Sequence, residues 1–206
     1  SNPESVHFRA VQQALFPGTA YGQDSGGDPV AIPDLTFEQF QAFHAQYYHP
    51  SNAWFWFYGD DPAGERLRLL DQYLGAFEAN PSDSRVEAVA LSDTPRHVSL
   101  NYAADPSEDL SSKSLITLNW VLTDTKPPPD VQFTLSFLSH LLLGTSASPL
   151  HKALVDAGLG SSVIGGGMDD DLLQPTFSVG LRDARTEDRD AVAEVVLRVL
   201  RHHAEH

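Results

Sequence analysis

The sequence of 206 residues contains no cysteine and a single methionine. The absence of cysteine excludes disulfide bonds and thiolate metal ligands, so any transition-metal site in this chain has to use His, Asp and Glu side chains. It also leaves the redox compartment undetermined, because a chain without thiols is compatible with an oxidising or a reducing one.

Basic residues are scarce as well. The chain has 13 Lys and Arg against 28 Asp and Glu, which gives a formal net charge of −15 at pH 7. Such a chain repels phosphate backbones and anionic lipids and attracts cationic ligands. The composition therefore argues against a nucleic-acid partner and favours a basic one.

Long apolar runs are also missing. No run approaches the roughly 20 residues of a membrane-spanning helix, which argues against insertion into a membrane. Hydrophobic residues nevertheless make up 41% of the chain and aromatic residues 10%, which favours a packed core over disorder. The length fits one large domain or two small ones, since domains commonly contain about 100–150 residues.

Apolar periodicity and capping residues predict three helices in the first half. The first spans Pro3–Phe16. The second begins after Thr36, which can form a capping box with Gln39. The third opens at Asp61-Pro62, where Asp61 is the expected cap and proline takes the first helical position.

Strands are predicted from runs rich in aromatic and β-branched residues. One is AWFWFYG (Ala53–Gly59), which we expect to be buried. In the second half, the strand candidates are HVSLNYA, SLITLNWVLT, SSVIGGG and QPTFSVGL. Helices are expected at Val131–Leu143, at Pro149–Ala157 and from Thr186 onward, the last with a buried stripe formed by Val192, Val195, Val196 and Val199.

This alternation of small sets of strands and helices is typical of the α+β class. We expect two-layer sandwiches, each with a mixed or antiparallel sheet that carries helices on one face. The polar stretch 81–96 has no sustained period and predicts a linker. The chain would then divide into residues 1–80, the linker and residues 97–206.

The chain ends in HHAEH, which contains the H-x-x-E-H pattern of one class of zinc peptidases. On a helix, His202 and His206 could reach one metal ion with Glu205 beside them. However, continuing the valine stripe places His203 and His206 near the buried face, and a catalytic zinc needs a third protein ligand. An ordinary helix end is therefore the preferred interpretation.

Two other patterns are weak candidates for chemistry. His44 and His49 are five residues apart across a helix end, which is a poor spacing for one metal ion. GTSAS (Gly144–Ser148) resembles a nucleophile elbow, but it lacks the final glycine and follows a helix instead of a strand. We expect no catalytic serine there.

The stretch VIGGGMDDD is more informative. Three glycines at the end of a strand let another backbone approach closely, while the three aspartates that follow would repel a phosphate. A peptide added to the strand edge is one interpretation, with its positive charges held by the carboxylates. A glycine-rich bulge closed by a solvated acidic turn is the other.

Four stretches together resemble one family. They are QQALFPGTAYGQDSGGDP, LTFEQFQAFHAQYYHPSNAWFWFYGDD, HLLLGTSASPL and VIGGGMDDDLLQPTFSVGL. In this combination the sequence resembles the presequence proteases, the organellar branch of the pitrilysin/insulinase-type zinc metallopeptidases, over essentially its whole length.

The resemblance implies a protein of four similar α+β domains that enclose a chamber. It places residues 1–80 in the C-terminal part of the first domain and residues 97–206 in the N-terminal part of the second, non-catalytic domain. The family's H-x-x-E-H helix and its third glutamate ligand correspond to sequence before Ser1. The resemblance therefore implies zinc in the full-length enzyme, but no metal ligand and no catalytic residue in this chain.

The resemblance also implies a function, namely the degradation of cleaved targeting presequences and other short unstructured peptides by a zinc-activated water. It implies the mitochondrial matrix or the chloroplast stroma as the location, with the cytoplasm as the alternative. Its implied partners are short basic peptides, which the charge of −15 complements, and the remaining domains of the same polypeptide. In related insulin-degrading enzymes the second domain holds the substrate's N-terminal end, and the corresponding candidate substrate-binding residues are His140, Gly144, Thr145, Ser146, Gly165, Gly166 and Gly167.

Two hypotheses stay open at this point. The chain is either a piece of an active peptidase, or part of a non-catalytic paralogue or assembly subunit with the same fold. A third and weaker hypothesis makes HHAEH an autonomous zinc site. The first is preferred, with the Trp54–Tyr58 strand as scaffold.

Overall fold

The computed structural model describes residues 2–80, 82–105 and 107–205. The chain forms two compact units. One consists of Ser1–Asp24 and Val86–His206, and the other of Ser25–Arg85. The division into residues 1–80, 81–96 and 97–206 concerns the domains of a longer protein and stays a prediction.

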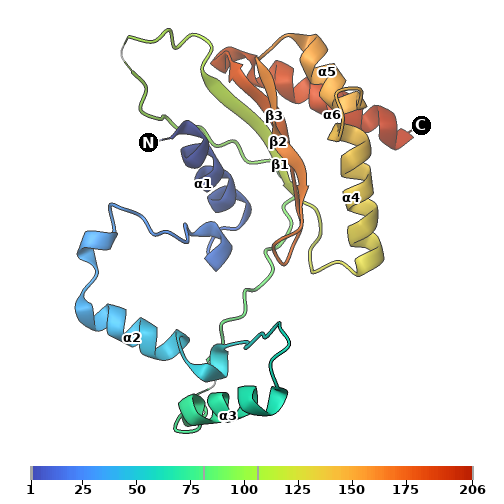
Figure 1. Cartoon of the computed structure of the whole chain (residues 1–206). Helices are drawn as coiled ribbons and strands as arrows, with labels where there is room; N and C mark the ends of the chain where they lie inside the picture. Colours follow the sequence, from blue (N-terminus) through green and yellow to red (C-terminus); the bar gives the residue numbers. More distant parts are fainter. Residues whose placement is uncertain (1, 81, 106, 206) are drawn as a thin grey trace. The chain divides into compact units, whose positions relative to one another are not determined.

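The larger unit contains a three-stranded antiparallel sheet (Figure 1). Its strands are β1 (Ser114–Val121), β2 (Ser162–Asp169) and β3 (Thr176–Ala184), in the order β1-β3-β2. The central strand β3 pairs with both neighbours, and β2 is therefore an outer strand. This position leaves β2 with one edge that no described strand pairs.

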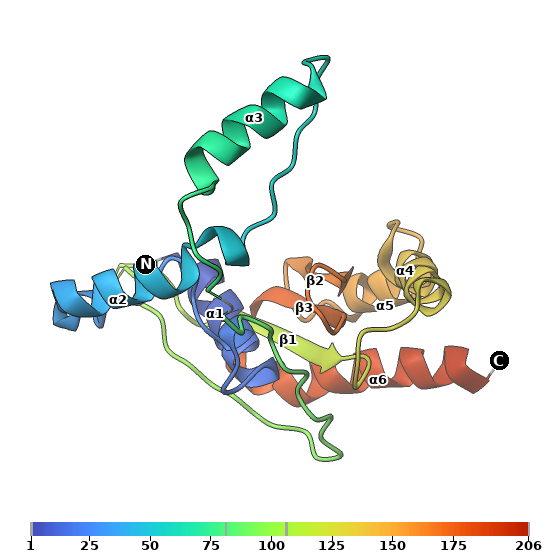
Figure 2. The same ribbon diagram turned by 90° about the horizontal axis from the view of Figure 1, so that it is seen from below.

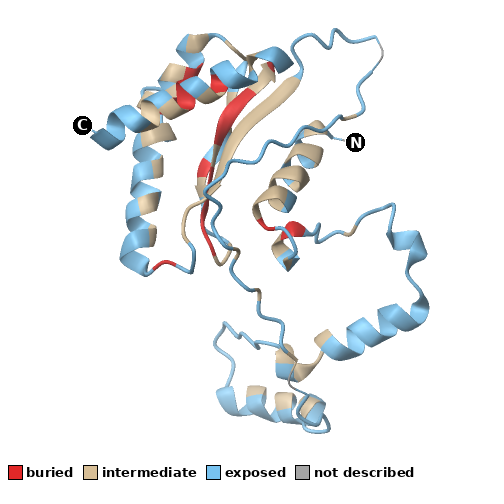
Figure 3. Ribbon diagram, turned by 180° about the vertical axis from the view of Figure 1, so that it is seen from behind, coloured by how far each residue is buried: buried red, intermediate tan, exposed pale blue. Residues whose placement is uncertain are grey.

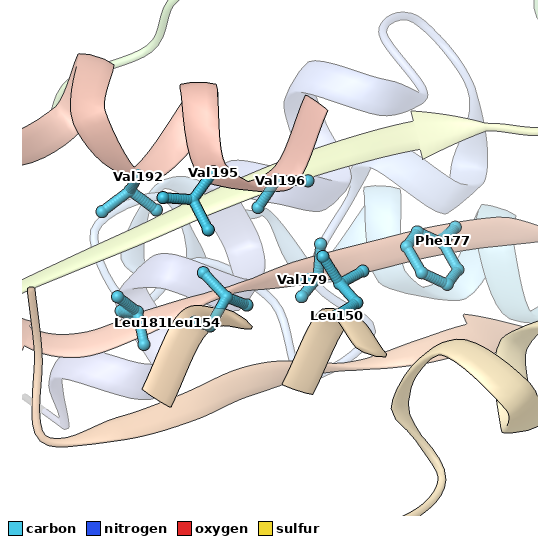
Figure 4. Packing of buried hydrophobic residues seen from close by; sticks show 8 residues of the cluster. All are labelled: Leu150, Leu154, Phe177, Val179, Leu181, Val192, Val195 and Val196. Carbon is cyan, nitrogen blue, oxygen red and sulfur yellow. The ribbon is translucent and has the colours of Figure 1, made fainter. Parts of the chain in front are cut away.

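Three helices cover one face of the sheet and form its core. They are α4 (Pro129–Leu143), α5 (Pro149–Ala157) and α6 (Arg189–Glu205). Alternation along the central strand directs every second side chain of β3 into this layer. Figure 4 shows the resulting cluster, which consists of Leu150, Leu154, Phe177, Val179, Leu181, Val192, Val195 and Val196.

Helix α1 (Pro3–Leu15) contacts the sheet through β1. Ile116 and Leu118 of β1 pack against the core, so Thr117 between them points to the other face. Its hydroxyl lies 2.9 Å from Nε2 of His7 in α1. Figure 1 accordingly shows α1 on the side of the sheet away from α4, α5 and α6.

The smaller unit contains α2 (Phe37–Tyr47) and α3 (Ala63–Leu74), with short 3₁₀ turns at Ile32–Asp34 and Pro50–Asn52. None of its described residues is buried, as Figure 3 shows by colour. The capping box of Thr36 and Gln39 is present, as the sequence predicts. This unit is therefore locally well specified but has no core of its own among the described residues.

The predicted α+β class and the antiparallel sheet are confirmed, and so are the six helices and the strands at 114–121, 162–169 and 176–184 within a few residues. The prediction of Asp61 as the cap of α3 is wrong, because the helix begins one residue later, after Pro62. Asp61 instead forms an ion pair with Arg66, at 2.6 Å. That pair spans the start of α3 and replaces the expected capping interaction.

Two predicted strands are absent from the described residues. Ala53–Gly59 and His97–Ala103 have no assigned strand, and neither is buried. Trp54, Trp56 and Tyr58 are almost wholly exposed. A strand needs a paired neighbour, and the described residues provide none for either segment.

No helix of the described part of the chain has the length and apolar character needed to cross a lipid bilayer.

Candidate functional site

Helix α4 contacts the outer strand β2, and Figure 2 shows this helix on the side of the strands away from α1. Two hydrogen bonds fix the relation between them. The side chain of Gln132, near the start of the helix, donates to Asp170 at 2.5 Å, and the backbone amide of Met168 donates to the Ser139 hydroxyl at 2.9 Å. The end of β2 therefore lies against the middle of α4, and the two predicted site segments, at 140–146 and 165–167, are brought to the same part of the unit.

The three candidate glycines of β2 all have a positive φ, but they have different surroundings. A Cβ at Gly165 would meet the backbone of Ser178 and Val179 at 2.6 Å, and one at Gly167 would meet the Ser139 hydroxyl of α4. A Cβ at Gly166 would have nothing within 4 Å. Of the three, only Gly166 therefore faces open space. At Gly165 the missing side chain lets β3 approach β2 closely, and at Gly167 it does the same for α4.

A β-bulge explains the conformation of this run. Ile164 pairs with Gly180 and Gly167 pairs with Ser178, so two residues of β2 lie opposite the single residue Val179 of β3. The extra residue bends the outer strand and needs backbone angles that glycine adopts without a Cβ penalty. The glycine run is thus built around a bulge in the edge strand.

The other predicted site residues form the turn between α4 and α5. Gly144 ends α4, its amide donates to the carbonyl of His140 at 2.7 Å, and a Cβ on it would run into the His140 ring. The amide of Thr145 donates to the Ser148 hydroxyl at 3.1 Å, and the amide of Ser148 donates back to the Thr145 carbonyl at 3.0 Å. His140, Thr145 and Ser146 are exposed, so their side chains are available to a ligand.

Negative charge collects at the end of β2. Asp169, Asp170 and Asp171 are exposed, and the Asp169 carboxylate accepts a hydrogen bond of 3.0 Å from the amide of Asp171. A pocket opens beside this turn and is lined by Tyr21, Lys126, Pro127, Gln132, Asp170, Asp171, Leu172, Leu173 and Pro175. The arrangement suits the recognition of a cationic group next to the strand edge.

Sequence reasoning missed Ser139, which joins the two predicted segments. Its neighbours Leu142 and Leu143 pack against the core, so the helix face that carries it is directed at the sheet. A serine on the apolar side of a helix is a weak signal, because the sequence does not show which strand the helix meets. The contact with Met168 becomes visible only with the tertiary structure.

The HHAEH pattern does not form a metal site among the described residues. The described part of the chain holds no group of three His, Asp or Glu side chains placed to bind a metal ion. His203 is exposed, so its expected position near the buried face is wrong, because the last turn of α6 extends beyond the packed core. His206 lies outside the described residues. The residues seen here therefore do not fit the zinc of the resembled family.

Comparisons with known proteins agree with the resemblance seen in the sequence. Presequence protease 1 (chloroplastic/mitochondrial) of Arabidopsis thaliana is 45% identical over 207 residues, which is 100% of this chain and 19% of that protein. Protein HypA of Clostridium perfringens is 36% identical over 204 residues, which is 98% of this chain and 21% of that protein. The chain thus spans about a fifth of the length of the curated relatives it matches.

A solved structure has the same fold. The crystal structure of a peptidase M16 inactive domain from Pseudomonas fluorescens aligns with a TM-score of 0.69, covering 99% of this chain and 47% of that one at 21% identity. At this identity the likeness concerns the fold alone. The family described as the peptidase M16 inactive domain matches residues 34–206, and the chain belongs to this family.

Proposed function

We propose that this chain is a segment of a zinc metalloendopeptidase that degrades targeting presequences and other short unstructured peptides. Its 45% identity to a plant presequence protease over the whole chain carries the proposal. The segment contributes scaffold and peptide-binding surface. The zinc ligands and the catalytic residues belong to other parts of the polypeptide, which in the relatives is about five times longer.

The outer edge of β2 is the proposed peptide-binding surface. Extended peptides add to such edges through main-chain hydrogen bonds. Gly166 faces open space, so a second backbone can approach the strand there. His140, Gly144, Thr145, Ser146, Gly165 and Gly167 flank or shape this edge and complete the proposed site.

The charge of the chain supports a basic peptide as the ligand. The chain carries a net charge of −15, and three exposed aspartates follow β2 directly. Targeting peptides are rich in basic residues and poor in acidic ones. A peptide paired with β2 would bring its positive charges next to the Asp169–Asp171 turn.

We assign residues 1–80 to the end of a first domain and residues 97–206 to a second one. The exposed aromatic segment of the smaller unit supports this division. Phe55 and Phe57 line an apolar pocket with Leu69, Leu70, Tyr73 and Leu74 of α3 and are 49% and 44% exposed. Trp54, Trp56 and Tyr58 alternate with them and are almost wholly exposed. A segment with this alternation needs a sheet to pair with, and we assign that sheet to the rest of the polypeptide.

We further propose an organellar location, in the mitochondrial matrix or the chloroplast stroma. The Arabidopsis relative is named a chloroplastic/mitochondrial protein. Localising a fluorescent fusion of the full-length protein tests this point, and a purely cytoplasmic signal would contradict it.

Peptide binding to the 206-residue chain tests the proposed surface. A labelled basic unstructured peptide should bind, its charge-reversed counterpart should not, and hydrogen exchange should show protection of the Ser162–Gly166 amides. Replacing Asp170 and Asp171 with Asn should weaken binding, whereas the matched control with Asp60 and Asp93 replaced by Asn changes the net charge equally and should bind as the unmodified chain does. Equal binding of both peptides, or no protection in β2, would contradict the assignment.

Hydrolysis by the full-length protein separates the two remaining hypotheses. Cleavage of the basic peptide that a zinc chelator abolishes is expected for an active peptidase. Binding without cleavage in the presence of zinc would instead favour a non-catalytic paralogue or assembly subunit.

A further inference from the structure

We infer that Gln174 is a positioning residue that fixes the linker to the larger unit by acting as a substitute strand partner for Val89. Gln174 lies two residues before β3 begins at Thr176 and is only 1% exposed. Val89 lies in the stretch 81–96, four residues after the smaller unit ends at Arg85. This inference is independent of any peptide bound at β2.

Both the oxygen and the nitrogen of the Gln174 side-chain amide form hydrogen bonds with backbone groups. Its oxygen accepts a hydrogen bond of 2.7 Å from the Val89 amide, and its nitrogen donates to the Val89 carbonyl at 3.0 Å and to the Thr123 carbonyl at 2.7 Å. Both hydrogens of the NH₂ group are therefore used. A carboxamide in this position presents one donor and one acceptor to Val89, as a neighbouring strand does.

The contact continues the ladder between β1 and β3. Leu122, directly after β1, donates its amide to the Pro175 carbonyl at 2.9 Å, and the next step pairs Thr123 with the Gln174 side chain instead of with a backbone. Val89 forms its hydrogen bonds with this same Gln174 side chain. The linker thus meets the sheet where regular strand pairing ends.

Among the described residues, no group other than the Gln174 side chain forms a hydrogen bond with this part of the linker. Among the described residues, 86–91 form no regular element, and the only hydrogen bonds that they make are those of Val89 with Gln174. Ala88 and Ala90, on either side of Val89, are exposed. One buried side chain therefore makes all the hydrogen bonds that hold residues 86–91 to the end of the sheet.

The geometry requires glutamine in particular. Leucine at this position would leave the Val89 amide and two carbonyls without a partner. A glutamate carboxylate could still accept from the Val89 amide, but it would face the two carbonyls with no hydrogen to donate. A protonated glutamate recovers one donor, so in Gln174→Glu the contact with the linker should strengthen as the carboxyl group becomes protonated.

Residue-resolved hydrogen exchange on the 206-residue chain tests the inference. In the unmodified chain, the Val89 amide should exchange at least about tenfold more slowly than the amides of Ala88 and Ala90. Gln174→Leu should remove this difference and speed proteolytic cleavage within 86–91. Gln174→Glu should do the same near neutral pH and recover part of the protection when the carboxyl group is protonated.

Gln132→Leu is the matched control, because Gln132 also donates through its side chain but to Asp170, away from the linker. It should leave Val89 protected. If Val89 of the unmodified chain exchanges as fast as Ala88, the inference is wrong, and this comparison stands even where a variant fails to fold. Retained protection of Val89 in a folded Gln174→Leu chain, or the absence of any pH-dependent recovery in Gln174→Glu, would also overturn it.

Discussion

The Ser139 hydroxyl of α4 accepts a hydrogen bond of 2.9 Å from the backbone amide of Met168 in β2. A helix side chain thereby occupies the place of a further strand at this point of the sheet edge. The contact requires the preceding residue, Gly167, to have no side chain, because a Cβ there would meet the same hydroxyl. The packing of α4 on the edge strand therefore depends on the glycine run, and we treat the three as one structural device.

This device predicts different outcomes for alanine at Gly166 and Gly167. Both have φ close to +80°, at +77° and +79°, so the backbone strain of alanine is similar at the two positions. Gly166→Ala should lower the free energy of unfolding by about 1–2 kcal/mol, the cost of a side chain in left-handed backbone. Gly167→Ala should cost about 1–3 kcal/mol more, because its Cβ is forced against Ser139. Urea unfolding of the two variants measures the difference.

A double substitution isolates the clash. In Gly167→Ala combined with Ser139→Ala, the hydroxyl is gone and the remaining Ser139 Cβ lies 3.8 Å from the Gly167 Cβ position. The two substitutions should therefore cost less together than the sum of their separate effects. Strict additivity would show that Ser139 does not set the requirement for glycine.

A core substitution in α5 should have a large effect on stability. Leu154 is 1% exposed and packs in the cluster between α5, α6 and β3, so Leu154→Ala should cost about 2–5 kcal/mol through lost burial and a cavity. Its neighbour Val155 is 56% exposed and supplies the control. Val155→Ala should change the free energy of unfolding by no more than about 0.5 kcal/mol. Equal effects in denaturant titrations would contradict the packing described for α5.

Local signals in the sequence predict the helices well. The capping box of Thr36 with Gln39 and the valine stripe of α6 each depend on residues a few positions apart. The structure confirms the capping box and buries Val192, Val195 and Val196, while Val199 is partly buried against the same core. Strands are less predictable, because a strand is a relation between distant segments. AWFWFYG has the composition of a strand, but the described residues contain no partner for it, and its aromatic side chains are exposed.

The candidate site shows the same limit. The glycine run and the turn after α4 are visible as patterns, and the structure brings both to the β2 side of the larger unit. The separate roles of Gly165, Gly166 and Gly167 are not predictable, since they depend on what β3 and α4 place next to each glycine. The role of Gln174 is equally unpredictable from the sequence, because its partners Val89 and Thr123 are 85 and 51 residues away.

The smaller unit offers a test of local stability. The Thr36 hydroxyl accepts from the Gln39 amide at 3.2 Å, and the Gln39 side chain accepts from the Thr36 amide at 2.8 Å. Thr36→Ala should destabilise α2 by about 1 kcal/mol, whereas Thr36→Ser keeps the hydroxyl and should change little. Hydrogen exchange of the first-turn amides of α2 measures the effect. Identical exchange in both variants would show that the capping box contributes nothing in solution.

The contact between α1 and the sheet should weaken in acid. Burial lowers the pKa of His7 below its ordinary value, which is about 6.5 in an unfolded chain. The unfolded state therefore binds a proton first as the pH falls below about 6.5, and the free energy of unfolding decreases until the pH reaches the lowered pKa of the folded state. Above about pH 6.5 both states are neutral at His7, so the effect is absent there.

A variant that keeps the hydrogen bond but cannot titrate isolates His7 from other groups. His7→Gln can still contact the Thr117 hydroxyl, and it leaves the nearby ion pair of Glu4 with Arg182 in place. Between about pH 7.5 and pH 5 the unmodified chain should lose more thermal stability than this variant, because only the histidine has the proton-linked penalty. If the melting temperatures of the two chains fall equally between these pH values, His7 is not buried against β1 in solution. Helix α1 would then not be docked through the contact with Thr117.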